Sequence, residues 1–409
     1  MRLPVDVCRN PVTVRLAFLG MPRSKSPPHI PHVALLVETS LGSGRDILRG
    51  IARYVRERGP WSLFHAPRSL DESAPAWLRH WKGDGIIARI ADAGLARMVK
   101  DSGLPVVDVL GNVPRSRFPL VHVDDRAIAQ LAFSHFRERG FRRFAYFGLS
   151  GESWSERRRD VYFEEARLAG AEPALLELTR VEIERTPWER RQEKLAGWLR
   201  QLAKPVGLMV CSDQRGLDVS EACRRANIAV PDQIAIVGVD NDEPLCQVCD
   251  PPLSSVWPDH IAVGYEAATL LRDLMNGEEP PAEPKLVPPR RLVTRHSSDV
   301  LAVEDTAVSA ALRVIRERAC TGISVDEIAR VSGASRSVLQ RRFRALLGLS
   351  IHDQIIETRL KRAGELIATT DLPLAEVAEL SGFKHQEYLG VVFKERVGVT
   401  PAEHRRACQ

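Results

Sequence analysis

Residues 325–350, VDEIARVSGASRSVLQRRFRALLGLS, decide the fold of the C-terminal part of the chain, because residues 374–400, LAEVAELSGFKHQEYLGVVFKERVGVT, repeat their pattern. Apolar and turn-forming positions recur at an offset of 49 residues and, after one inserted residue, of 50. The recurring residues are Val325, Ile328, Ala329, Ser332, Gly333, Phe343, Gly348 and Ser350 in the first copy, and Leu374, Val377, Ala378, Ser381, Gly382, Phe393, Gly398 and Thr400 in the second. The surface positions differ, so the pattern predicts one structure built twice with two different surfaces.

Each copy has the pattern of two short helices joined by a turn, which is a helix-turn-helix. In the first copy, Ser324 and Glu327 are placed to form a capping box, and the turn follows at Ser332 and Gly333. Ser335 is placed to cap the second helix. That helix is expected to carry Leu339, Phe343 and Leu346 inward.

Longer helices are expected before and between the two copies. The segment TAVSAALRVIRERA puts Val308, Ala311, Leu312 and Ile315 on one helical face. The segment SIHDQIIETRLKRAGELIATT is predicted to be a single helix, capped by Ser350 with Asp353 at the third position. A stiff helix between two modules of the same structure fixes the distance between them.

Length and composition describe an ordinary globular chain. It has 409 residues, 27% charged and 44% hydrophobic, which is enough for two or three domains. No apolar run approaches the roughly 18 to 20 residues that span a bilayer, so no membrane partner is expected. Residues 1–31 are read as an N-terminal tail with a Pro-rich tether and no secretory signal. The net charge of +5 is compatible with an anionic partner without requiring one.

The 7 cysteines are scattered, which favours a reducing cytoplasm over a disulfide framework. Cys246 and Cys249 form C-x-x-C, but no second ligand pair follows at zinc spacing, so we expect no metal and assign them no role.

Residues 32–296 alternate compact apolar runs with amphipathic stretches, which predicts a doubly wound α/β architecture. The runs are HVALLVE, WSLFHA, DGIIARI, LPVVDVL, FAYFGL, VGLMVCS and IAIVGVD. Gly42 and Gly44 begin a dinucleotide fingerprint, but Ile47 replaces its third glycine. No phosphate-binding loop, metal motif or nucleophile motif is visible, so neither an enzyme nor a cofactor is expected.

The stretches IAIVGVDNDEPLCQVCDPPLSSV, GYEAATLLRDLMNGEEP and LVPPRRLV resemble the sugar-sensing domain of the LacI/GalR repressors. This resemblance implies a two-lobed fold like that of periplasmic sugar-binding proteins, with an effector held between the lobes. It places the first lobe at about 32–121 and 256–278, and the second at about 124–252 and 283–296. The crossovers would lie near 121–124, 252–256 and 277–284.

The same resemblance implies which residues hold a sugar. Carboxylates and an arginine satisfy hydroxyl groups, and an indole covers the apolar face of the ring. Asp240 and Asp213 end strands at ligand-binding positions of the family, although Ser212 replaces the usual asparagine before Asp213. Arg159 matches the family arginine, with Arg157 and Arg158 as neighbouring alternatives. Trp154, expected in the loop before that helix, is the stacking candidate, and Glu38 after the first strand is a further candidate.

Residues 305–409, after a linker at 297–304, resemble the AraC-type DNA-binding domain, in which two recognition helices enter successive major-groove segments. The positions matched to base reading are Arg336, Ser337, Gln340, Arg341 and Arg344 in the first copy, and Lys384, His385, Gln386 and Glu387 in the second. Gly390 and Val391 stand where polar readers are common, which predicts sparser reading there. Candidate phosphate contacts are Arg359, Lys394, Arg405 and Arg406.

The whole chain, a LacI-like sensor followed by an AraC-like reader, resembles regulators of xylose operons. That resemblance implies a cytoplasmic transcription activator of carbohydrate use that binds double-stranded DNA and a monosaccharide such as xylose. A homodimer is expected, with RNA polymerase as a candidate partner. The alternatives are the same architecture sensing another sugar or a sugar acid, and a sugar-binding protein without a regulatory role.

Overall fold

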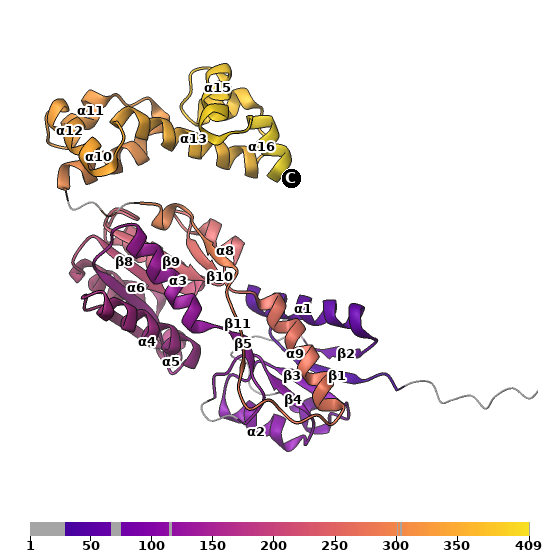
Figure 1. The fold of residues 1–409 in the computed structure, drawn as a ribbon. Helices are drawn as coiled ribbons and strands as arrows, with labels where there is room; N and C mark the ends of the chain where they lie inside the picture. The colour runs from indigo at the N-terminus through magenta and orange to yellow at the C-terminus, as the bar shows by residue number, and fades with distance from the viewer. Residues whose placement is uncertain (1–28, 67–74, 114–116, 301, 303–304, 409) are drawn as a thin grey trace, which may run out of the picture.

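The computed structural model describes residues 29–66, 75–113, 117–300, 302 and 305–408. The structure consists of two α/β lobes, between which the chain crosses three times, followed by a helical C-terminal domain (Figure 1). This confirms the predicted fold class. Most of the expected N-terminal tail, residues 1–28, lies outside the described residues.

The first lobe is built on a parallel sheet with the strand order β2-β1-β3-β4. Its strands are β1 (His32–Leu36), β2 (Ser62–His65), β3 (Gly85–Ala88) and β4 (Val106–Asp108). Its helices are α1 (Gly42–Arg58), η1 (Ala76–His80), α2 (Ala93–Asp101) and α9 (His260–Met275). The apolar runs form the strands because both faces of the sheet are covered; every residue of β3 is buried.

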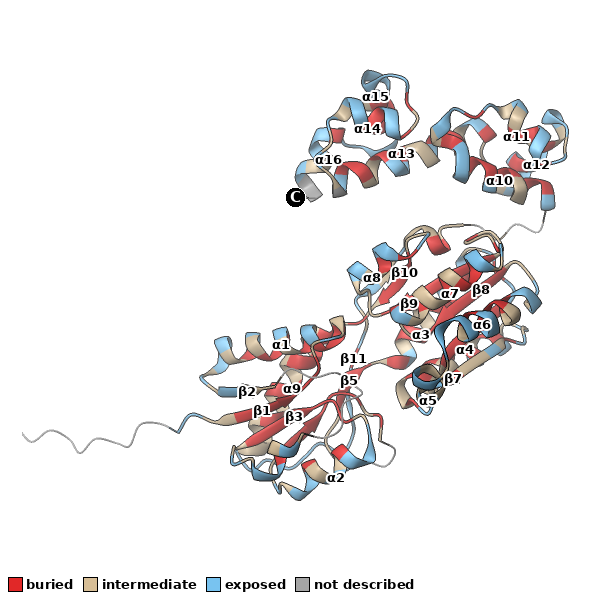
Figure 2. Ribbon diagram, turned by 180° about the vertical axis from the view of Figure 1, so that it is seen from behind, coloured by how far each residue is buried: buried red, intermediate tan, exposed pale blue. Residues whose placement is uncertain are grey.

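The second lobe is built on a sheet with the order β12-β10-β9-β8-β6-β7, parallel except for β12. Its strands are β6 (Phe144–Ser150), β7 (Ala174–Thr179), β8 (Val206–Val210), β9 (Ile234–Val239), β10 (Ser254–Trp257) and β12 (Arg291–Val293). Its helices are α3 (Asp125–Glu138), α4 (Ser153–Leu168), α5 (Arg180–Arg185), α6 (Trp188–Gln201), α7 (Asp213–Arg225), α8 (Glu243–Val248) and η2 (His296–Ser298). Figure 2 shows the buried central strands, such as β8 and β9, between helices whose outer faces are exposed.

Three chain segments connect the lobes, and two of them differ from expectation. Strands β5 (Val121–Val123) and β11 (Lys285–Val287) pair in parallel, and the first crossing follows β5 as expected. The second crossing was expected at 252–256, but β10 is hydrogen-bonded into the second-lobe sheet, so the chain crosses between Trp257 and His260. The third was expected at 277–284 and follows β11 instead.

The linker was predicted at 297–304, but its first two residues belong to the second lobe. Ser297 and Ser298 are completely buried in the second lobe. The Ser297 hydroxyl donates to the Ile236 carbonyl at 2.6 Å, and Ser298 lies 2.7 Å from His135 Nε2. Buried hydroxyls with hydrogen-bond partners belong to a packed structure.

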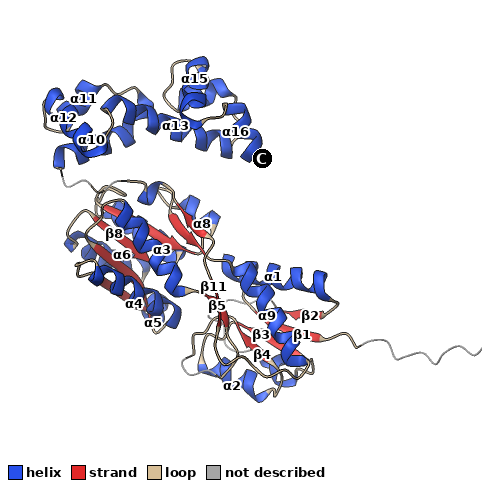
Figure 3. Ribbon diagram, in the orientation of Figure 1, coloured by secondary structure: helices blue, strands red, loops and turns tan. Residues whose placement is uncertain are grey.

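The C-terminal domain is entirely helical in its described residues (Figure 3). Its helices are α10 (Thr306–Arg318), η3 (Ala319–Thr321), α11 (Val325–Val331), α12 (Arg336–Leu347), α13 (Ile351–Thr369), α14 (Leu374–Leu380), α15 (Gln386–Val397) and α16 (Pro401–Cys408). Each copy of the repeat has its own core: Leu339 and Phe343 are buried in one, Leu389 and Phe393 in the other. Helix α13 contributes Ile355 to the first core. It contributes Ile356 and later residues of the same helix to the second core, so one continuous helix joins the two copies.

The capping predictions have mixed outcomes. Ser324 with Glu327 and Ser350 with Asp353 both form capping boxes, as predicted. Ser335 does occupy the N-cap of α12, but its side chain makes no capping hydrogen bond. Leu346, expected to face inward, is 53% exposed and was wrongly predicted. No described helix is long and apolar enough to cross a membrane.

Candidate effector pocket and DNA-reading surface

A cavity of about 360 Å³ lies between the lobes, at the carboxyl ends of their strands. The first lobe contributes the turn after β1 and the residue after β3, while the second contributes the turns after β8 and β9. The charged and aromatic lining residues are Arg89, His122, Trp154, Arg158, Arg180, Asp213, Arg215, Asp240, Asp242 and His260. Of the five residues predicted to contact an effector, Trp154, Asp213 and Asp240 line this cavity, whereas Arg159 and Glu38 do not.

Asp240 faces the cavity from a strained turn. It directly follows β9, and its φ of 110° lies in a region that residues other than glycine rarely adopt. Its backbone N–H donates to the Val256 carbonyl at 3.0 Å, which ties the turn to the neighbouring strand. The side chain is 25% exposed, and Oδ1 lies 3.3 Å from Nε2 of His260. Strain of this kind persists where the surroundings fix a functional geometry.

Asp213, the first residue of α7, shapes the pocket from within the protein. Its carboxylate accepts hydrogen bonds from the Ser255 hydroxyl at 2.7 Å, the Asp242 backbone N–H at 2.8 Å and the Cys246 thiol at 3.4 Å. Burial, with the nearby Asp240 charge, raises the pKa of Asp213 well above its usual value. Cys246 therefore has a structural role here, and no metal-binding cluster occurs among the described residues.

Arg158, rather than Arg159, faces the cavity. Arg159 lies elsewhere on α4 and pairs with Glu177 at 2.9 Å, because consecutive helical residues point about 100° apart. The Arg158 Nε donates to Asp125 Oδ1 at 2.8 Å and one of its Nη atoms donates to the Cys211 carbonyl at 2.8 Å. Asp125 also accepts from Arg157 Nε at 2.8 Å. Asp125 was not predicted from the sequence; its neighbour Asp124 caps the same helix by accepting from the Ala127 N–H at 3.0 Å.

Trp154 lies inside α4, one residue after the start of the helix, and not in the preceding loop. The Arg158 guanidinium lies over its indole ring, 5.1 Å from the ring centroid. The indole Nε1 donates to Glu152 at 3.1 Å. The ring is therefore held at both its face and its polar edge while it lines the cavity.

Glu38 lies behind the cavity wall, where it is buried and accepts a hydrogen bond from Arg89. Arg89 lines the cavity and also donates to the Ser43 hydroxyl at 3.1 Å. Glu38 therefore orients Arg89, the arginine that reaches the cavity. A single sequence does not show that a side chain acts through another residue in this way.

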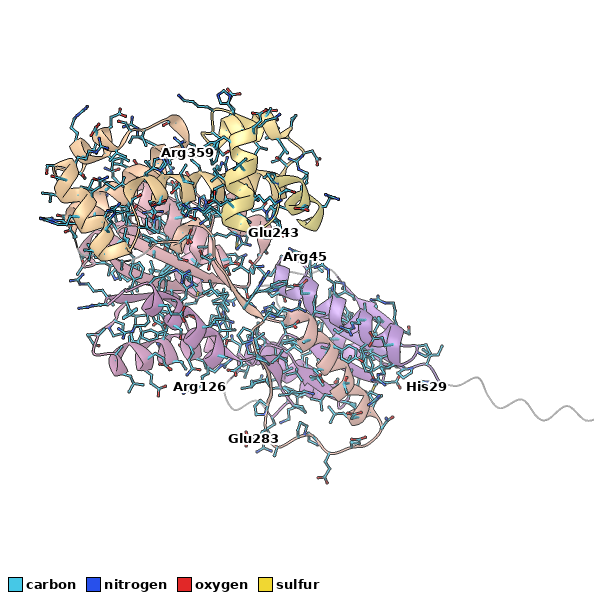
Figure 4. All side chains as sticks on the ribbon, turned by 45° about the horizontal axis from the view of Figure 1, so that its top comes forward. His29, Arg45, Arg126, Glu243, Glu283 and Arg359 are labelled. Atoms are coloured by element: carbon cyan, nitrogen blue, oxygen red, sulfur yellow. The ribbon has the colours of Figure 1, made fainter. Side chains whose placement is uncertain are left out.

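Each lobe caps a helix of the other lobe across the cleft. Helix α1 has Leu41 at its N-cap, without a side-chain cap, and its Gly42 N–H donates to Asp242 of the second lobe at 3.2 Å. Helix α4 likewise lacks its own cap, and its Ser153 N–H donates to Asn112 of the first lobe at 2.8 Å. Arg45 adds a contact to Asp242 at 3.8 Å; Figure 4 labels Arg45 and Glu243, the residue that follows Asp242 in the chain. Separating the lobes leaves both helix ends uncapped.

The first recognition helix, α12, presents a basic surface. Leu339 and Phe343 are buried, whereas Arg341 and Arg344 are exposed and Gln340 is half-buried. Arg336 is exposed and pairs with Asp326 of α11 at 3.2 Å. The Ser337 hydroxyl lies 3.4 Å from that of Ser335. The residues predicted to read bases therefore lie along one side of α12.

The second copy places its predicted readers at the start of α15. Lys384, His385, Gln386 and Glu387 are all exposed and line a groove between the two copies. Arg359 also lines this groove, where its Nε donates to the Ala319 carbonyl at 2.8 Å, and Figure 4 labels it.

The other phosphate candidates differ in exposure. Lys394 and Arg406 are exposed, whereas Arg405 is half-buried and donates to the Leu372 carbonyl at 2.6 Å. Arg405 therefore holds the segment before α14, which makes it a poorer phosphate candidate than the other two.

Polar contacts between described residues join the second lobe, and Asp299 directly after it, to the helical domain. Asp232 pairs with Arg316 of α10, and Asp299 pairs with Lys361 of α13. His296 Nε2 lies 2.7 Å from Glu365 Oε1, also on α13. Burial opposes ionisation of Glu365, but the His296 hydrogen bond and the neighbouring cations lower its pKa overall. Helices α10 and α13 lie on the side of the domain next to the second lobe, and α15 lies on the far side (Figures 1 and 3).

Family models match three parts of the chain: an XylR N-terminal domain at residues 32–123, a periplasmic binding protein-like domain at 133–298 and a helix-turn-helix domain at 328–407. The xylose operon regulatory protein of Escherichia coli K12 is 32% identical over 386 residues, which cover 91% of this chain and 96% of that protein. Its Haemophilus influenzae counterpart is 31% identical over 384 residues, or 92% and 98% of the two chains.

A solved structure of the xylose-binding transcription activator XylR matches with a TM-score of 0.79 and 29% identity, covering 93% of this chain and 99% of that one. A LacI-type regulator from Alkaliphilus metalliredigens, solved with D-xylulofuranose, shares the two-lobed fold at a TM-score of 0.52 and 19% identity, over 66% and 99% of the chains. The chain belongs to the family of xylose operon regulatory proteins, and it is a transcription regulator that carries both the sensor and the DNA-binding part of that family.

Proposed function

We propose that this regulator binds D-xylose, or a closely related neutral monosaccharide, between its lobes and activates genes of pentose use through its tandem helix-turn-helix domain. The observation that carries the proposal is that Asp240, Arg158 and Trp154 line one interlobe cavity in a chain that ends in two helix-turn-helix units. The carboxylate and guanidinium suit sugar hydroxyls, and the indole suits the C–H face of the ring.

The charge balance around the cavity favours a neutral sugar over a sugar acid. Four arginines line it, but each has a carboxylate partner of its own. The pairs are Arg89 with Glu38, Arg158 with Asp125, Arg180 with Glu152, and Arg215 with Asp218. Asp240 and Asp242 add negative charge to the lining, so an anionic effector would meet no uncompensated arginine.

A ligand panel tests this proposal directly. Thermal unfolding of the full chain is measured with pentoses, hexoses and uronic acids at equal concentration. D-xylose or a close relative should raise the melting temperature, because a ligand that binds only the folded state stabilises it by about 2.7 kcal/mol at a hundredfold excess over Kd. A larger rise in melting temperature with a uronic acid would show that the effector is a sugar acid rather than a neutral sugar. If the protein bound a sugar but no DNA, it would be a sugar-binding protein without a regulatory role.

Closure of the lobes is the proposed response to the sugar. The reciprocal caps at Gly42 and Ser153 form only when the lobes are together, so they add to the stability of the closed form. The second lobe then carries its contacts from Asp232, His296 and Asp299 into α10 and α13. Because α13 joins both cores of the helical domain, a shift of this helix changes how the two recognition helices are presented.

Replacing Asn112 with alanine should weaken sugar binding about 2- to 30-fold, because a lost N-cap costs about 0.5–2 kcal/mol and this cap exists only in the closed form. Isothermal titration calorimetry measures the affinity. Asp92→Ala is the matched control, since Asp92 caps α2 within the first lobe by accepting from the Leu95 N–H at 2.8 Å. Equal affinities for wild type and Asn112→Ala would exclude this cap from closure.

Replacing Arg341 with alanine should weaken binding to the cognate site by about 1–3 kcal/mol while leaving non-specific binding nearly unchanged. No hydrogen bond or ion pair to another described residue engages this exposed arginine, so it is available to a base edge. The control is Arg342→Ala, because Arg342 pairs with Asp305 at 3.1 Å. An unchanged footprint and affinity for Arg341→Ala would remove it from base reading.

The division of the chain and its assembly are also proposals. We place the sensor at residues 32–298, including η2, and the DNA-binding domain at 305–409. We further propose a cytoplasmic homodimer, formed through the sensor, that contacts RNA polymerase at the promoters it activates. Sedimentation as a monomer with and without sugar would exclude the dimer.

A further inference from the structure

The two recognition helices carry opposite chemistry at equivalent positions. Leu389 and Phe393 of α15 are buried as Leu339 and Phe343 of α12 are, so the helices superpose at an offset of 50 residues. This register puts Gly390 where α12 has Gln340, and Val391 where it has Arg341. The most polar part of the first reading surface is therefore apolar in the second.

Val391 is held out to solvent. It is 65% exposed, and it lies on the same stripe of α15 as the exposed Glu387 and Lys394, four residues before and three after. The apolar side chains that pack the second copy come instead from the opposite face of the helix. An exposed valine between charged neighbours does not contribute to the core, so its apolar surface is available to a partner.

Gly390 has no reason inside the protein to be glycine. A Cβ at this position would meet no atom within 4 Å, so packing does not require its absence. Glycine inside a helix costs about 1 kcal/mol relative to alanine. No contact within the chain accounts for this loss of helix stability at Gly390. Close approach of a binding partner to the helix at this residue would account for it.

We propose that Gly390 and Val391 together read the 5-methyl group of thymine in the major groove. The thymine methyl is the apolar group that base edges present there, and it is recognised by apolar side chains. Gly390 lets the helix approach the base edge, and Val391 covers the methyl. Lys384 and Lys394 flank this surface with positive charge, which suits the phosphates on either side of a groove.

The inference deepens the proposed function and rests on it. The two half-sites bound by one monomer differ in kind. The half under α12 is read by hydrogen bonds from Arg341 and Gln340 to purine edges, and the half under α15 depends on thymines about one helical turn away.

The test uses uracil in place of thymine, because this exchange removes only the methyl group. Duplexes that bind the full-length protein are first selected from a random pool. Each dT in the selected site is then replaced in turn by dU, and Kd is measured at one salt concentration. One or two positions in the half-site away from the Arg341 footprint should lose affinity about 3- to 5-fold, the contribution expected for one buried methyl.

Protein variants then assign that loss to the helix. Val391→Ala should bind the dT and dU sites with nearly equal affinity, because the contact that distinguishes them is gone. Val397→Ala, on another face of α15 and 45% exposed, should keep the wild-type preference for dT. Gly390→Ala should fold at least as stably as wild type yet bind the site several-fold more weakly.

The outcomes separate this inference from the proposed function. A selected site whose affinity depends on Arg341, but whose dT preference is the same in wild type and Val391→Ala, would overturn the thymine contact alone. A pool from which no sequence is enriched would overturn sequence-specific DNA binding, and the thymine contact with it.

Discussion

Replacing Asp125 with alanine is expected to lower the free energy of unfolding by about 3–5 kcal/mol, because it leaves a buried cation without its partner. Asp125 is buried and accepts from Arg158 and Arg157 at 2.8 Å each, while His122 Nε2 lies at 3.5 Å. Arg158 is only 3% exposed, so solvent screens the uncompensated charge weakly. Because Arg158 lines the cavity, sugar binding should fall as well.

The contribution of Asp125 to stability is expected to depend on pH. Burial opposes ionisation of Asp125, but Arg158, His122 and Arg157 outweigh it, and the pKa of Asp125 lies below its usual value. The ionised carboxylate therefore stabilises the fold above its unfolded pKa of about 3.9, and this stabilisation declines as the pH falls toward the folded pKa. The wild type should lose stability below about pH 4, and Asp125→Asn should lose less over that range.

Urea denaturation from pH 3 to pH 7 measures both effects. The matched control is Asp160→Ala on α4, because Asp160 pairs with Arg159 at 2.8 Å but its side chain is 66% exposed. Exposed ion pairs contribute about 0–1 kcal/mol, so this control should stay near the wild type. A loss below about 1 kcal/mol for Asp125→Ala would show that Arg158 finds another partner.

The fold followed from local sequence patterns wherever local interactions determine it. The capping boxes at Ser324 and Ser350 form within four consecutive residues, and the buried faces of α10 and α12 follow from helical periodicity. The prediction for Leu346 was wrong because the next residue, Leu347, packs against the core in its place and Leu346 points to solvent. The predicted positions of the crossings near β10 and β11 were wrong because strand pairing decides which lobe a segment joins. Strand pairing cannot be deduced from a local sequence pattern.

The site was harder to predict because it depends on contacts between distant segments. Three consecutive arginines are indistinguishable in sequence, and only the packing of α4 shows that Arg158 faces the cavity. Asp125 and Glu38 hold cavity arginines from behind, through partners 33 and 51 residues away. Asn112 and Asp242 cap helices of the opposite lobe, across 41 and 200 residues. Asp240 was predictable because it directly follows a strand in a recognisable motif.

Replacing Asp240 with alanine is expected to weaken sugar binding about 10- to 100-fold, since a hydrogen bond to a charged group contributes about 1.5–3 kcal/mol. Thermal unfolding of this variant should no longer respond to a sugar concentration that stabilises the wild type. Basal DNA binding should persist, because Asp240 lies in the interlobe cavity and the reading surfaces lie on the helical domain.

Asp240→Gly separates the carboxylate from its strained backbone. Both variants lack the carboxylate, but only glycine adopts a φ of 110° without cost. The unliganded glycine variant should therefore be more stable than Asp240→Ala by about 1 kcal/mol, and equally unresponsive to sugar. Asn227→Gly, which relieves a φ of 56° outside the cavity, should keep the full response. Full sugar response in Asp240→Gly would mean that the turn, rather than the carboxylate, binds the effector.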